Sequence, residues 1–125
     1  MRRLRVAAVA AFSLTLVAPS AAQTPAAQTI DVRSYSFAPA PIRLTAGKPV
    51  TLTFVNNSGS GHDFTAKDFF AHSAITAGAA PGGKIELKRH ETKKITLVPR
   101  AGTYEAHCSH FLHASMGMHD QIVVG

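Results

Sequence analysis

The stretch "YEAHCSHFLHASMGMHDQIVV", residues 104–124, consists of two alternating segments separated by a glycine-containing loop. Residues 104–108 and 120–124 are typical of half-buried β-strands, in which successive side chains face opposite sides of a sheet. Residues 107–120 hold the only cysteine, four of the seven histidines and two of the three methionines. This pattern predicts a fold built from strands, with its chemistry concentrated in the loop that joins the last two.

The rest of the chain repeats the same kind of pattern. Short alternating segments are separated by turn-rich stretches such as "NNSGSG" and "TAGAAPGG". We expect strands at 29–37, 42–45, 50–55, 62–66, 84–88 and 93–98, with a short helix or irregular excursion at 67–75. Seven or eight short strands without a long helix predict an all-β fold, an antiparallel Greek-key β-sandwich. In a sandwich the loops gather at the two ends, where residues distant in sequence can form one site.

The first 22 residues are typical of a signal peptide. Arg2, Arg3 and Arg5 precede an apolar run, residues 6–18, that is too short to span a bilayer with ease. Small residues follow, and we expect cleavage after Ala22, with an uncleaved membrane anchor as the alternative. Residues 23–29 are expected to be a disordered lead-in to a single domain over 30–125. This organisation predicts a periplasmic protein without stable membrane insertion.

The charge of the exported part is mild. Removal of the three arginines leaves ten Lys and Arg against seven Asp and Glu, a net charge of about +3. No run of Lys and Arg with interleaved aromatic residues is present, so nucleic acid is not an expected partner. A chain of this length is sufficient for one domain with one core, and we expect a monomer.

The single cysteine restricts the chemistry. Cys108 cannot form an intramolecular disulfide, so it is an inert buried thiol, an intermolecular bridge or a metal ligand. Cys108, His113 and Met118 follow the spacing C-x4-H-x4-M, and a thiolate, an imidazole and a thioether together suit copper. His62, after a glycine-rich approach, is the candidate second imidazole. Zinc is a competitor for Cys and His, although it gains little from a thioether.

The segments "GHDF" and "GTYEAHCSHFLHASMGM", some 45 residues apart, resemble the cupredoxin family, small blue-copper proteins such as plastocyanin, pseudoazurin and azurin. The resemblance extends to "AGKPVTLTFVNN" and "GMHDQIVV". It implies a cupredoxin-like sandwich that binds one copper ion. The family's ligands, carried onto this sequence, are His62, Cys108, His113 and the weak axial ligand Met118.

The resemblance also implies a link between the two ligand-bearing segments. In relatives an Asn after the first histidine ligand forms a hydrogen bond with a Ser or Thr after the cysteine. Asp63 and Ser109 occupy these places, so we expect Ser109 to donate to Asp63. The carboxylate is a departure from the family pattern, and its charge should favour Cu(II) and lower the potential.

Several histidines and methionines around the loop need separate interpretation. Met118 is preferred over Met116 as the axial ligand, because Gly117 before it permits a tight reversal of the backbone. His110 stands where relatives more often have an apolar residue. It is interpreted as a surface side chain, a substitute ligand or, with Met116, part of an accessory metal site. His107 and His119 are expected on the surface, with a role in copper capture as the alternative.

Three functional hypotheses follow from these residues. The first is an exported electron carrier that cycles one copper ion between Cu(I) and Cu(II), with a redox protein as its partner. The second is a periplasmic copper-handling protein that exchanges the metal with a copper donor or acceptor. The third is a cupredoxin-like sandwich that holds no metal. No general acid or base constellation is evident, so we do not expect an enzyme.

Overall fold

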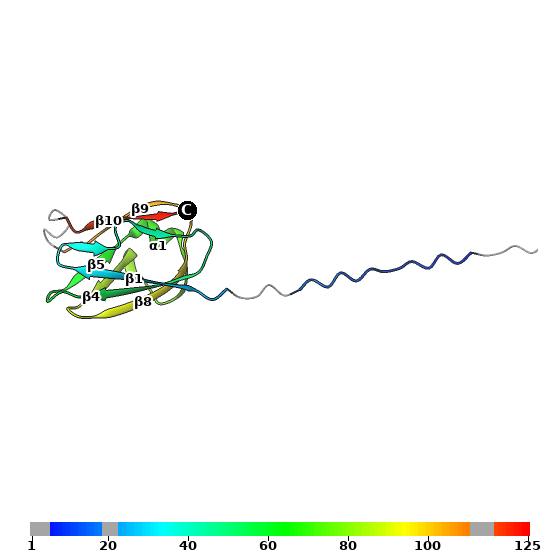
Figure 1. Ribbon diagram of the computed structural model, residues 1–125, viewed down its shortest axis with the longest axis horizontal. Coiled ribbons are helices and arrows are strands. Elements are labelled where there is room, and N and C mark those ends of the chain that lie inside the picture. The colour runs from blue at the N-terminus through cyan, green and yellow to red at the C-terminus, as the bar shows by residue number, and fades with distance from the viewer. Residues whose placement is uncertain (1–5, 19–22, 111–116) are drawn as a thin grey trace, which may run out of the picture.

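The described residues form two five-stranded sheets that enclose one hydrophobic core (Figure 1). The computed structural model describes residues 6–18, 23–110 and 117–125. The strand order is β2-β1-β4-β8-β6 in the first sheet and β3-β10-β9-β5-β7 in the second. The expectation of an all-β sandwich is confirmed.

The first sheet contains β1 (Ala26–Arg33), β2 (Ser36–Ala38), β4 (Val50–Asn56), β6 (Ala74–Ala77) and β8 (Thr92–Val98). The second sheet contains β3 (Ile42–Leu44), β5 (His62–Thr65), β7 (Lys84–Leu87), β9 (Gly102–His107) and β10 (His119–Val124). A short helix, α1 (Lys67–His72), follows β5, and a single 3-10 turn, η1 (Pro81–Gly83), precedes β7.

The sheets are mixed, whereas the sequence predicted antiparallel pairing throughout. β1 is parallel to β4, and β3 is parallel to β10. After the β1–β2 hairpin the chain enters the second sheet as β3 and returns to the first as β4. A parallel pair requires such a crossover and cannot be joined by a tight turn. Each sheet therefore gains one parallel pair from the path of the chain between the sheets.

The first strand begins earlier than the sequence predicted. Residues 26–29, expected to be part of a disordered lead-in, belong to β1 and pair with residues 50–53 of β4. The expected strand over 29–37 is two strands joined at Ser34 and Tyr35, and Tyr35 has a positive φ of 62°. Most side chains of residues 26–29 are exposed, so the backbone pairing of this segment leaves no alternating apolar pattern in the sequence.

Residues 6–18 form no regular secondary structure and extend away from the sandwich (Figure 1). The predicted cleavage position after Ala22 lies outside the described residues. No helix within the described ranges is both long enough and apolar enough to cross a membrane.

The core follows the predicted alternation. Leu52 and Phe54 of β4 are buried, and so are Ile95 and Leu97 of β8. Each such side chain stabilises the fold by roughly 1.5–3 kcal/mol relative to an exposed one. The two sheets therefore form a rigid frame for the loops at their ends.

Phe69 and Phe70 close the core at one side of the second sheet. Both residues lie on α1 and are buried. The ring of Phe70 is 6.2 Å from that of Phe64, and the ring of Phe69 is 5.6 Å from that of Tyr104. The helix thereby covers the core next to β5 and β9.

Candidate metal centre

Three of the four predicted ligands lie on, or directly next to, neighbouring strands of the second sheet. His62 is the first residue of β5, Cys108 directly follows β9, and Met118 directly precedes β10. β9 lies between β10 and β5 in the sheet. The backbone N–H of Cys108 donates to the carbonyl oxygen of Met118 at 3.0 Å. The sheet thus brings together residues that are separated by more than 40 positions in the sequence.

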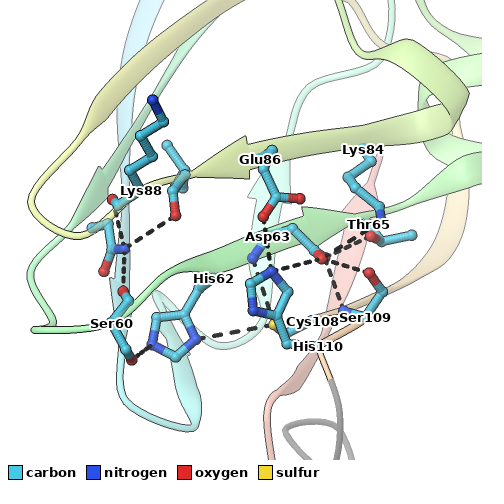
Figure 2. Close-up of polar contacts among 12 residues, drawn as sticks. Ser60, His62, Asp63, Thr65, Lys84, Glu86, Lys88, Cys108, Ser109 and His110 are labelled. Carbon is cyan, nitrogen blue, oxygen red and sulfur yellow. Dashed lines mark hydrogen bonds and ion pairs between the residues drawn. The ribbon is translucent and has the colours of Figure 1, made fainter.

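The Cys108 thiol and the His62 imidazole face each other in the interior. Nδ1 of His62 lies 4.0 Å from Sγ of Cys108, and the two residues are 1% and 0% exposed. Nε2 of His62 lies 3.2 Å from Oγ of Ser60, which fixes the other side of the ring (Figure 2). A hydrogen bond to the remote ring nitrogen is the usual way in which a ligating histidine is oriented. Nδ1 is therefore the nitrogen presented to the sulfur.

Burial and backbone donors act in opposite directions on Cys108. Burial raises the pKa of the Cys108 thiol, and this effect outweighs the backbone hydrogen bonds from Asp63 and His110. The N–H of Asp63 lies 3.5 Å from Sγ. A buried thiol in this state is protonated at neutral pH, and binding of a cation favours its deprotonation. The pocket thus suits a metal thiolate better than an isolated anion.

The predicted link between Asp63 and Ser109 is present. Oγ of Ser109 donates to Oδ2 of Asp63 at 2.5 Å, and its backbone N–H donates to Oδ1 at 2.9 Å (Figure 2). Thr65 also donates to Oδ1, at 2.7 Å. Burial alone would raise the pKa of Asp63, but the hydrogen bonds from Ser109 and Thr65 hold it below its usual value. Asp63 is therefore a buried carboxylate that ties the segment after β9 to β5.

His110 lies beside this network. Its Nε2 is 2.8 Å from Oε1 of Glu86 and 3.5 Å from Oδ2 of Asp63. Asp63, Cys108 and His110 each offer one ligand atom within 4.8 Å of the others. Sequence reasoning missed Glu86 and Ser60. Glu86 lies on β7, and only the β5–β7 pairing, which places Glu86 opposite Asp63, brings it near.

Met118 is 0% exposed, and Gly117 before it has a positive φ of 95°. This conformation favours glycine and agrees with the predicted backbone reversal at that position. His113 and Met116 lie outside the described residues, so their predicted roles remain predictions. His107 and His119 are exposed as expected, and His72 and His90 are exposed as well.

The chain belongs to the cupredoxin-like domain family, whose sequence pattern matches residues 5–124. Its fold is similar to that of reduced auracyanin from the photosynthetic bacterium Roseiflexus castenholzii, with 18% identity and a TM-score of 0.61 over 82% of this chain and 99% of that one. Auracyanin B is 23% identical, with a TM-score of 0.56 over 84% of this chain and 93% of that one.

A multicopper oxidase from Campylobacter jejuni also shares the fold, with 11% identity and a TM-score of 0.63. The match covers 84% of this chain but only 31% of the oxidase. Among curated protein sequences, none matches this chain. Identities this low establish the shared architecture, and the chemistry must be argued from the residues of the site.

Proposed function

We propose that this protein is an exported, mononuclear copper protein that carries electrons and is not itself an enzyme. His62, Cys108, His113 and Met118 are the proposed ligands. The observation that carries the proposal is the buried approach of Nδ1 of His62 to Sγ of Cys108 at 4.0 Å. Two imidazoles, one thiolate and a weak thioether suit copper in both oxidation states.

The residues around this pair fit that role. Ser60 orients the His62 ring, and Asp63 holds Ser109 next to Cys108. Copper, when bound, supplies a one-electron couple. A frame that fixes the ligands limits their rearrangement when the oxidation state changes, and outer hydrogen bonds tune the potential. The Roseiflexus auracyanin with this architecture was reduced with dithionite, which supports a redox role for the fold.

The proposed location and partner follow from the sequence. The charged, apolar and small-residue segments of the first 22 residues support export to the periplasm. A monomeric carrier there would exchange electrons with a redox protein. The multicopper oxidase with the same architecture is a much longer chain, of which this domain corresponds to 31%.

A copper-handling role is the second candidate, and the histidines outside the buried pair favour it. His110 contacts Glu86 at the edge of the site, and further histidines are exposed near the same loop. Imidazoles at a surface bind copper reversibly. In this role the protein would receive the ion from a donor or pass it to an acceptor.

One experiment separates the two roles. Copper-loaded protein is cycled electrochemically and, separately, incubated with a chelator in its oxidised and reduced forms. Reversible cycling with slow loss of copper in both states supports the carrier. Rapid loss of copper in one oxidation state, without stable cycling, supports metal delivery and contradicts the carrier. A protein that retains zinc but not copper would contradict both roles.

A further inference from the structure

Two exposed histidines face each other across neighbouring strands of the second sheet. His107 is the last residue of β9, and His119 is the first residue of β10. β9 and β10 lie side by side (Figure 1), and their antiparallel register places His107 directly opposite His119. Both residues are exposed. Their placement is a consequence of the strand pairing and does not depend on the loop between them.

The inward orientation of the proposed ligands explains why these histidines face outward. Cys108 and Met118 are buried, and successive residues of extended chain point to opposite faces. Opposite residues of an antiparallel pair share a face, with Cβ atoms about 4.5–5.5 Å apart. Since a metal binds imidazole nitrogen at about 2.0–2.1 Å, both rings can reach one ion between them.

A carboxylate lies on the same face. Glu105 is two residues before His107 on β9, and its Oε1 accepts a hydrogen bond from Nε2 of Gln121 at 3.2 Å. Glu105 and His119 line one surface hollow, together with Gln121. The Glu105 carboxylate is therefore an oxygen donor on the same face of the sheet and lines the hollow beside His119, which is exposed to solvent.

We propose that His107 and His119 form a second metal site on the outer face of β9 and β10, specific for a divalent transition-metal ion and tightest for Cu(II). Imidazole and carboxylate ligands accept zinc, nickel and copper, and the affinity order among these ions places Cu(II) first. The site contains no thiol. It is separate from the buried Cys108 and does not depend on the proposed electron-carrier function.

The test is a titration of the purified full chain with Cu(II) alone, read by equilibrium dialysis and by the electron paramagnetic resonance spectrum. We expect the wild-type protein to bind one equivalent more than His107→Ala or His119→Ala. The additional ion should give the spectrum of tetragonal Cu(II) with nitrogen ligands. His72→Ala and His90→Ala remove exposed histidines elsewhere and should bind as the wild type does.

Three results would overturn the proposal: no additional equivalent in the wild type, its retention in both His107→Ala and His119→Ala, or its loss in His110→Ala instead. Thermal unfolding checks that the variants fold. If an alanine variant does not fold, His107→Gln and His119→Gln replace it in the same titration. Failure of the buried site is distinguishable, because it removes the thiolate absorption band. The difference of one Cu(II) equivalent between the wild type and the histidine variants can be measured whether or not the buried site binds copper.

Discussion

The carboxylate of Asp63 accepts two hydrogen bonds from Ser109. Oγ of Ser109 lies 2.5 Å from Oδ2, and the backbone nitrogen lies 2.9 Å from Oδ1. This contact joins the residue after His62 to the residue after Cys108. Lys84 lies 3.8 Å from the same carboxylate and is partly exposed to solvent. A negative charge is therefore held within the ligand-bearing framework, at a position where the family resemblance implies a neutral amide.

Asp63→Asn should raise the reduction potential of the copper-loaded protein. Removing a buried negative charge disfavours Cu(II) more than Cu(I), and the amide retains the shape of the side chain. We expect a rise of roughly 60 mV, which corresponds to a tenfold shift of a one-electron equilibrium. The measurement is protein-film or solution voltammetry. Asp68→Asn removes an exposed carboxylate on α1 and is the charge-matched control. An unchanged or lowered potential in Asp63→Asn would count against the contact's electrostatic role.

Asp120→Asn should alter how stability depends on pH. Burial raises the pKa of Asp120, and its Oδ2 accepts no hydrogen bond from the described residues. The folded state therefore binds this proton more tightly than the unfolded state, so the wild type loses stability as pH rises from about 4 through the raised pKa. The side-chain amide of Asp120→Asn does not titrate, so the variant does not lose stability in this way as the pH rises.

We expect the free energy of unfolding of Asp120→Asn, relative to that of the wild type, to be higher at pH 7 than at pH 4, because only the wild-type carboxyl group titrates. Urea unfolding of the metal-free proteins at both pH values measures the difference. Asp68→Asn, which changes an exposed carboxyl group on α1, is the control. A relative stability that does not change between the two pH values would show that Asp120 titrates normally in the folded state.

Met118→Gln should shift both the potential and the visible spectrum of the copper-loaded protein, whereas Met116→Gln should leave both nearly unchanged. Met118 is buried and precedes β10, whose pairing with β9 fixes its backbone. An axial thioether tunes the potential of such a site. Both variants replace a thioether with an amide, so Met116→Gln is the matched control for Met118→Gln. If Met116→Gln were the one to shift the spectrum, the assigned register of the ligand loop would be wrong.

The alternation of apolar and polar residues predicted those strands in which buried and more exposed side chains alternate. Leu52 and Phe54 are buried, and their neighbours Thr51 and Thr53 are only partly buried, so β4 was evident from the sequence. Residues 26–29 are held in β1 by backbone hydrogen bonds while most of their side chains are exposed, which leaves no such signal. The parallel pairs were likewise not predictable, because they depend on the path of the chain between the sheets.

The site was predictable to the extent that rare side chains mark it. Cys108 and Met118 stand out by residue type, and the Asp63–Ser109 contact followed from the family resemblance. Glu86 and Ser60 carry no comparable signal, since serine and glutamate are common surface residues. Their contacts with His110 and His62 arise from the β5–β7 pairing and from the turn before β5.

The most direct test of the central claim is the visible absorption spectrum of the oxidised, copper-loaded protein compared with that of Cys108→Ser. If the buried pair of His62 and Cys108 holds copper, the wild type shows an intense thiolate-to-Cu(II) band at one copper per chain. Cys108→Ser then lacks the band while remaining folded by circular dichroism. A wild-type protein that binds copper without this band, or a Cys108→Ser variant that retains it, would contradict the assignment of Cys108 as a ligand.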